Sequence, residues 1–314
     1  MSSRLTISLT VCLIFPALIL ASCAGPAPRH PAGVAADTEW TRAMKAGRTA
    51  FDRGDLDLAA GFYQAALSRG RTMDNSSAIA DAAYNLAACR VAQGEYASAR
   101  ALLKEAKAEM SRSHDEPGDV LLVEAQVMWH LGEPEQAISL TEKLLGSAHT
   151  ESKEGLQTQA RLLRGKIACA KGDKERAIAE LQSAEKISGE ESNPAVNAGR
   201  SELAGCISLL QGNTAQAAQQ FDREANSLRE AGQYRKMADA LTRAADAYHR
   251  SSLPGEAADR YFQAARTIFT LGDSPQALDL ATKALGAATE AKDQSLQERT
   301  RSLLVEIDKA DANR

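Results

Sequence analysis

A turn-forming residue recurs at nearly constant intervals along most of the chain. The glycines of this series are 40, 38, 40 and 40 residues apart, and a serine stands where the sixth member is expected. The series consists of Gly54, Gly94, Gly132, Gly172 and Gly212, followed by Ser252. A sequence with this period folds as a stack of similar units, each burying its apolar face against its neighbours. The repeat therefore favours an elongated array over one or two globular domains, although the length of 314 residues allows both.

The residues around each turn position describe a helical hairpin. After the turn, apolar residues recur at helical spacing, which predicts one buried face on the following helix. In the first copy this face consists of Leu56, Ala59, Ala60, Tyr63, Ala66 and Leu67. A small residue also recurs seven positions before each turn, as Gly47, Ala87, Ala125, Gly165, Gly205 and Ala245. Because glycine accepts the positive φ that commonly ends a helix, each copy is predicted to be two antiparallel helices joined by a tight turn.

This pattern resembles the tetratricopeptide repeat superfamily over residues 39–290. The resemblance implies an all-α fold, a right-handed α-solenoid of about six to seven helix hairpins. We expect the repeat array at 38–290 and a C-terminal capping helix at 291–314. The period near 40 exceeds the roughly 34 residues usual in that family, which implies longer helices or loops. Gly272 repeats the turn pattern after only twenty residues, so segment 254–271 has two candidate helix partners.

The N-terminal residues have the features of a secretory signal. Arg4 precedes an apolar run that ends in Leu20-Ala21-Ser22-Cys23. This ending resembles the bacterial lipobox, which implies that residues 1–22 are a removed signal peptide and that Cys23 carries lipid, including palmitate. Residues 23–37 are then a proline-rich tether. Ala24 after the cysteine favours an outer-membrane lipoprotein that faces the periplasm; simple secretion and an uncleaved anchor remain alternatives.

Composition and motif searches bear on the class of function. The formal net charge of −4 disfavours a nucleic-acid binder, which normally carries a basic face. No phosphate-binding or nucleophile motif follows a strand pattern, and the five histidines lack metal-ligand spacing, so we predict no cofactor, no metal site and no enzyme. Apart from Cys12 and Cys23, the cysteines fall on predicted first helices; they are Cys89, Cys169 and Cys206. Whether Cys169 and Cys206 form a disulfide between adjacent repeats stays open.

The resemblance also implies which residues bind a partner. In such arrays the first helices line a concave groove, so groove residues are expected on them. The positions are Arg48, Phe51, Tyr84, Asn85, Gln126, Trp129, His130, Lys166, Arg243, Asp246 and His249. Asn85 lies in an Asn-Leu-Ala run similar to the family's Asn-Leu-Gly, in which the asparagine often bonds a peptide backbone. The full lysine and asparagine clamp for a terminal carboxylate is not present, so that ligand is not predicted.

The resulting hypothesis is a membrane-anchored periplasmic scaffold that binds another envelope protein or peptide. Similar lipid-anchored proteins of this superfamily include pilotins, barrel-assembly factors and export-associated adaptors, and the sequence does not choose among them. Two alternatives remain. One is a cell-wall-directed enzyme or its regulator, for which only Asp246 with His249 offers side chains. The other is a self-associating structural spacer, and the oligomeric state is open.

Overall fold

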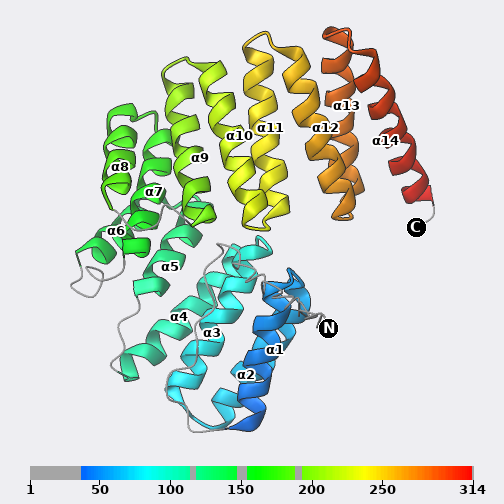
Figure 1. The fold of residues 1–314 in the computed structure, drawn as a ribbon. Helices are drawn as coiled ribbons and strands as arrows, with labels where there is room; N and C mark the ends of the chain where they lie inside the picture. Colours follow the sequence, from blue (N-terminus) through cyan, green and yellow to red (C-terminus); the bar gives the residue numbers. More distant parts are fainter. Residues whose placement is uncertain (1–36, 114–117, 147–153, 188–192, 313–314) are drawn as a thin grey trace, which may run out of the picture.

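The chain folds as a curved stack of helical hairpins (Figure 1). The structure is a computed structural model that describes residues 37–113, 118–146, 154–187 and 193–312. Within these residues it contains fourteen helices and no strand, which confirms the predicted all-α solenoid. Residues 1–36 lie outside the described part, and with them Cys23, the predicted signal peptide and all but the last residue of the tether.

Successive helices pair into seven hairpins in chain order. The pairs are α1 (Thr38–Asp52) with α2 (Leu56–Thr72), α3 (Ser76–Ala92) with α4 (Tyr96–Ser113), α5 (Gly118–His130) with α6 (Pro134–Leu145), α7 (Glu154–Ala170) with α8 (Lys174–Lys186), α9 (Pro194–Leu210) with α10 (Thr214–Glu230), α11 (Tyr234–Arg250) with α12 (Pro254–Thr270), and α13 (Ser274–Glu290) with α14 (Gln294–Ala312). Among the described helices, none has both the length and the apolar character needed to cross a bilayer.

The recurring glycines end the first helix of each hairpin in the predicted way. All five have φ between 73° and 80°, and the serine at the sixth position has φ of 58°. In the first copy the Gly54 N–H donates to the Phe51 carbonyl at 2.9 Å, and the Asp55 N–H donates to the Ala50 carbonyl at 3.0 Å. These two bonds form a Schellman motif, which satisfies carbonyls left over at the helix end. The turn prediction is therefore confirmed at each of the repeated positions.

The same left-handed turn also joins hairpins to one another in parts of the array. Between consecutive hairpins, φ is 45° at Asp74, 70° at Gly232 and 84° at Gly272. Inside the last hairpin, in the turn between α13 and α14, Lys292 has φ of 56°. From α9 to α13 every helix has 17 residues and every connection has three, so a helix begins every twenty residues. This explains why Gly272 repeats the pattern after twenty residues. In this region α12 packs against both α11 and α13, and α14 packs on α13.

Two of the repeated small residues receive an aromatic ring of the partner helix. A Cβ added at Gly47 would lie 2.8 Å from the Tyr63 ring, and one added at Gly205 would lie 2.5 Å from the Phe221 ring. Both rings are buried, with exposed fractions of 1% and 3%. The helices of these hairpins therefore approach each other at a point where no side chain fits.

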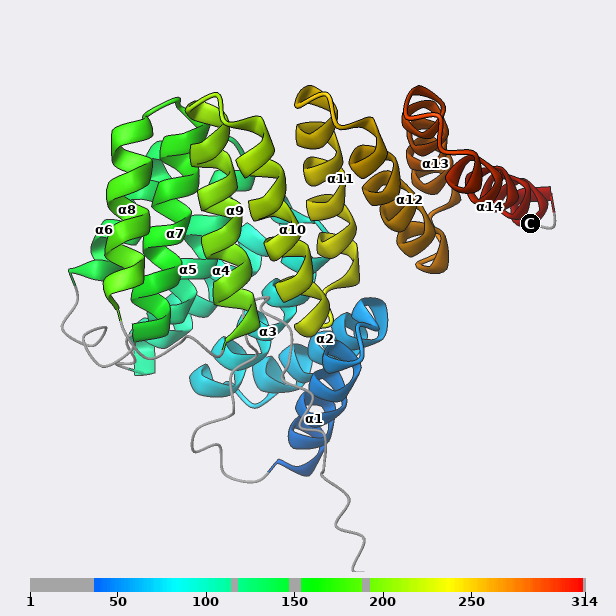
Figure 2. The same cartoon turned by 45° about the horizontal axis from the view of Figure 1, so that its top comes forward.

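Over the first five hairpins the first helices contact one another and form the inner layer of the stack, whereas toward the C-terminus the second helices α12 and α14 are in contact. Close contacts join α1 to α3, α3 to α5, α5 to α7, and α7 to α9. The second helices α2 to α10 make no comparably close contact with one another in the described residues. A stack whose first helices are closer together than its second helices curves toward the first helices. Figures 1 and 2 show this bend, with α1–α4 and α9–α12 as its two arms.

Candidate protein-binding surface

Five charged or titratable side chains on first helices lie close enough to act on one another, and we call them the inner charged row. They come from α5, α7, α9 and α11, and they are His130, Lys166, Glu202, Lys236 and Arg243. The Lys166 Nζ donates to Glu202 Oε2 at 3.0 Å, which joins α7 to α9. The charges of Lys166 and Lys236 also act on His130, and those of Lys166, Lys236 and Arg243 act on Glu202. The row therefore spans four consecutive first helices.

The row crosses these helices at an angle. His130, Lys166 and Glu202 follow one another at intervals of 36 residues, whereas the turns around them repeat every 40. Each step from one first helix to the next thus moves back by about one helical turn. Because the helices run parallel, side chains offset in this way lie on one diagonal line across the inner surface.

The surroundings of the row determine the charge of its members. Burial raises the pKa of Glu202, but the charges of Lys166 and Arg243 outweigh it and leave that pKa below its ordinary value. Glu202 is therefore a carboxylate at neutral pH. Burial, with the neighbouring charges of Lys166 and Lys236, lowers the pKa of His130. His130 is thus uncharged at neutral pH, and its ring stacks on the Tyr96 ring of α4, with centroids 4.3 Å apart and an interplanar angle of 3°.

The Arg243 side chain is held by the buried carboxylate of Glu224. Its guanidinium donates to Glu224 Oε1 of α10 at 2.6 Å and lies 5.4 Å above the centre of the Phe221 ring. Glu224 is only 4% exposed, and burial raises its pKa to about 7. The hairpin of α7 and α8 has a similar arrangement, because Arg164 Nε lies 2.8 Å from Glu180, which is 6% exposed. Arg164 and Glu180 belong to one hairpin, whereas Glu224 of α10 holds Arg243 of the next hairpin, so in each case a buried carboxylate on a second helix pairs with an arginine on a first helix.

The structure brings some of the predicted groove residues to the inner surface. His130, Lys166 and Arg243 belong to the inner charged row. Gln126 and Trp129 lie on α5 beside His130 and are partly exposed. These five positions share the inner side of the central hairpins, so the prediction that they bind a partner remains open and accessible to test.

Three predicted groove residues lie inside the protein core. Phe51 is 4% exposed, Tyr84 is 1% exposed and Asn85 is fully buried. The Asn85 side chain donates to the Asp81 carbonyl within α3 at 2.8 Å, so it bonds its own helix. The burial of Tyr84 and Asn85 follows from the position of α3, which is packed by α1, α2, α4 and α5, whereas Phe51 lies on α1, which packs against α2 and α3. A ligand would have to displace helices to reach these side chains.

The side chains at the remaining predicted positions bond to residues outside the row. Arg48 Nε is 3.1 Å from both carboxylate oxygens of Asp52 on α1. Asp246 accepts a hydrogen bond from the Tyr261 hydroxyl of α12.

His249 Nε2 lies 3.0 Å from Glu290 of α13. Asp246 and His249, the pair considered for an enzyme, thus bond to different neighbours. Among the described residues there is also no group of three or more metal-type ligands, while His30, His114 and His149 lie outside that part of the chain.

Sequence reasoning missed two members of the row, Glu202 and Lys236. The predicted residues stand at fixed distances from each turn glycine, so they occupy the same positions on each first helix. The inner surface instead follows a diagonal, and the signal that reveals it is the 36-residue spacing from His130 to Lys166 to Glu202. A search that allows one helical turn of drift per repeat would have included Glu202.

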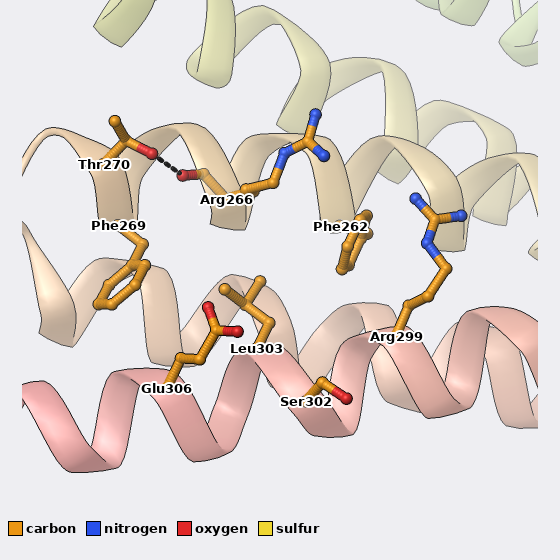
Figure 3. A pocket seen from close by; sticks show the side chains of 8 residues that line it. All are labelled: Phe262, Arg266, Phe269, Thr270, Arg299, Ser302, Leu303 and Glu306. Atoms are coloured by element: carbon orange, nitrogen blue, oxygen red, sulfur yellow. Dashed lines mark hydrogen bonds between the residues drawn. The ribbon is translucent and has the colours of Figure 1, made fainter.

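A hollow lies between α12 and α14 (Figure 3). Its lining consists of Phe262, Arg266, Phe269, Thr270, Arg299, Ser302, Leu303 and Glu306. The guanidinium groups of Arg299 and Arg266 lie 4.6 Å and 5.9 Å from the centre of the Phe262 ring. Both arginines thus lie within cation–π distance of one ring, and the contact of Arg299 with Phe262 helps to pack α14 on α12.

Comparisons with known proteins agree with this fold. A family model described as tetratricopeptide repeat matches residues 44–115, which cover most of the first two hairpins. Together with the hairpin architecture, this match supports the tetratricopeptide repeat superfamily for the chain. Comparison with curated proteins finds no significant sequence match.

Several solved structures share the architecture at low sequence identity. The apo quorum sensor NprR from B. thuringiensis aligns with a TM-score of 0.57 and 11% identity, over 87% of this chain and 89% of NprR. A Rap protein complexed with Competence and Sporulation Factor aligns with a TM-score of 0.54 and 14% identity, over 88% of this chain and 97% of the Rap protein. NprR in complex with its cognate peptide NprX aligns with a TM-score of 0.53 and 15% identity, over 87% of this chain and 72% of NprR. These likenesses establish the solenoid fold.

Proposed function

We propose that this chain is a scaffold that binds a peptide segment of another protein along the inner charged row. The observation that supports this most directly is the convergence of Lys166, Glu202, Lys236 and Arg243 from three neighbouring first helices. The side chains of Lys166, Glu202 and Arg243 remain 34%, 30% and 40% exposed, so they retain contact with solvent. Such groups can exchange water for the polar groups of a bound segment.

The chemistry of the row favours a segment with both charges and an apolar anchor. Glu202 offers carboxylate oxygens, while Lys166, Lys236 and Arg243 offer donors. Trp129 on α5 provides a partly exposed ring at the end of the row near His130, and aromatic side chains are frequent anchors at interfaces. Two of the similar solved structures, the Rap protein and NprR, are described with a bound factor or peptide, which agrees with this type of ligand.

A charge reversal in the row tests this proposal. Lys166→Glu removes the donor to Glu202 and places two carboxylates at the centre of the row. A partner captured by crosslinking from the native envelope is expected to bind this variant at least about tenfold more weakly. Lys104→Glu makes the same change on an exposed position of the second helix α4 and serves as the matched control. Unchanged affinity of the Lys166 variant, with its helix content intact, would exclude the row as the binding site.

The same capture distinguishes the other candidate functions. A second copy of the chain as the dominant crosslinked product would favour the self-associating spacer. A heterologous envelope protein that is lost with Lys166→Glu would support the scaffold in envelope assembly, of the pilotin, barrel-assembly or export type. The enzyme hypothesis has no supporting contact at Asp246 and His249, which bond to Tyr261 and Glu290.

We also propose that the scaffold is anchored by lipid at Cys23 in the outer membrane and faces the periplasm. The support is the Leu20-Ala21-Ser22-Cys23 sequence after an apolar run, with alanine next to the cysteine. Several acyl chains together give stable attachment, whereas one chain binds only marginally. Cells fed labelled palmitate should label the wild-type chain in the outer-membrane fraction. Cys23→Ala should abolish both labelling and membrane attachment, and a variant that still fractionates with the outer membrane would contradict the anchor.

A further inference from the structure

Helices α7 and α9 pack unusually closely, and the contact has a defined register. A Cβ added at Gly165 would lie 2.4 Å from Leu203 Cδ2, and one added at Gly199 would lie 3.1 Å from Leu162 Cδ1. The paired residues are 38 and 37 positions apart, and both pairs advance in the same direction along the chain. The two helices are therefore parallel, in contact, and held at an offset of 37 to 38 residues.

This register places two thiols opposite each other about one helical turn further on. Cys169 of α7 and Cys206 of α9 are 37 residues apart, which is the offset of the contact. Both belong to the apolar cluster that contains Leu203 and Ala168. Each of the two thiols shifts the pKa of the other, as expected of close neighbours, and both cysteines are in the free thiol form. The geometry thus brings together two sulfurs from adjacent hairpins.

The two thiols differ in environment. Cys169 is 5% exposed, whereas Cys206 is partly exposed on the inner surface. The neighbouring Cys169 thiol, with a further contribution from the charge of Arg243, lowers the pKa of Cys206, while the Cys206 thiol and burial raise that of Cys169. Cys206 is therefore the better nucleophile of the pair, because the thiolate is the reactive form.

Cys89 provides an internal comparison. It lies on α3 and is fully buried, and burial raises its pKa to about 12. A thiol in this environment has little thiolate at neutral pH and no access for an oxidant. It should remain unreactive under conditions that modify Cys206.

We propose that Cys169 and Cys206 form a reactive dithiol that a disulfide oxidant converts into an intramolecular disulfide between the fourth and fifth hairpins. The Cys206 thiolate attacks one sulfur of the oxidant, whose S–S bond breaks and releases one thiolate, and this leaving thiolate takes up the proton lost by Cys206. Cys169 then loses its proton and attacks the Cys206 sulfur of the mixed disulfide, which releases the second thiol. The net reaction oxidises two protein thiols and reduces one disulfide to two thiols.

Oxidation would act directly on the inner charged row. Cys206 lies one helical turn after Glu202 on α9, and Cys169 lies three residues after Lys166 on α7. A covalent bond there fixes the position of α7 against α9, and with it the distance between the two charged side chains. This site is independent of the proposed peptide ligand, because the thiols and their register are present without one.

The reaction can be followed on the full-length protein with oxidised glutathione as the oxidant. After incubation in the folded state, free thiols are blocked at acid pH with N-ethylmaleimide, the chain is digested with trypsin, and the peptides are weighed by mass spectrometry. Cleavage after lysine and arginine places Cys169 in peptide 167–171, Cys206 in peptide 201–223 and Cys89 in peptide 72–90. We expect peptide 167–171 to be linked to peptide 201–223, and Cys89 to react at least about tenfold more slowly than Cys206.

Single-cysteine changes separate the two roles. Cys169→Ser should stop the reaction at a stable glutathione adduct on Cys206, whereas Cys206→Ser should leave Cys169 unmodified. The proposal is overturned if the wild-type chain stays reduced at both positions, if Cys206 keeps glutathione without linking to Cys169, or if Cys89 reacts as fast. The wild-type measurement alone decides the question if either variant fails to fold.

Discussion

Replacing Gly205 with alanine tests the close contact between α9 and α10. The new methyl group would lie 2.5 Å from the Phe221 ring, which is 97% buried and cannot move aside without displacing its neighbours. Overpacking of this kind costs about 1–3 kcal/mol. Alanine recovers up to about 1 kcal/mol of helix propensity relative to glycine. With the full recovery, the expected net effect is therefore a loss of up to about 2 kcal/mol in the free energy of unfolding.

Gly61→Ala is the matched control, because it makes the same change on α2 at an exposed position with no atom within 4 Å of the added Cβ. This variant should gain about 0.5–1 kcal/mol, since only the propensity contribution applies. Urea unfolding followed by far-ultraviolet circular dichroism measures both changes. Amide hydrogen exchange in α9 and α10 shows whether the loss is local, which matters in a repeat array whose units can open separately.

A second substitution tests the physical cause. In the second hairpin alanine and leucine occupy the equivalent places, as Ala87 and Leu103, and both are buried. Phe221→Leu should therefore cost stability alone but relieve the clash in combination with Gly205→Ala. The double-mutant cycle should show a favourable coupling of at least about 1 kcal/mol. Additive effects, or a Gly205→Ala variant as stable as Gly61→Ala, would refute the explanation by steric overlap.

Three further results are expected from equally local changes. Burial raises the pKa of Glu224 to about 7 from an ordinary 4.5, so the folded state takes up a proton first as the pH falls. The stability of the wild type relative to Glu224→Gln should therefore rise from about pH 7 down to about pH 4.5 and then level off, measured by urea unfolding across this range; a difference independent of pH would contradict it. Ser252→Gly should stabilise the protein by up to about 1 kcal/mol and so raise its melting temperature, because the serine has φ of 58°. An unchanged or lower melting temperature would argue against backbone strain at this position. Asn75→Ala should lose about 1 kcal/mol, because the side chain accepts the Ala78 N–H at 3.0 Å and caps α3. Asn75→Ser should retain most of that capping, and equal losses in both variants would exclude it.

The turns and the packing faces were predictable because they depend on local chemistry. A glycine that ends a helix and an alanine on an apolar face have the same structural role in every copy. Gly54, Gly94 and their equivalents therefore predicted the turns of the hairpins correctly. Gly205 was identified from the sequence as a repeating small residue, and the structure adds that it contacts the ring of Phe221.

The candidate binding surface could be predicted only in part. His130, Lys166 and Arg243 were named from the sequence, yet Tyr84 and Asn85 were expected on the groove and lie in the core. The difference arises because exposure depends on how strongly the array curves and how each helix is tilted, and these are sums of many small rotations between neighbours. The nearly constant length of the repeat does not predict those rotations.

The twenty-residue spacing of helices has a consequence for how such an array can change in length. From α9 onward the connections within and between hairpins are the same size, so the turns do not distinguish an inner helix from an outer one. Duplication of one helix with its turn would keep the helix lengths and the turn sizes unchanged. It would, however, move each later inner helix, together with its charged side chains, to the outer layer. Duplication of two would keep both layers. A gene for this chain can therefore gain or lose units without disturbing its inner surface only in steps of forty codons.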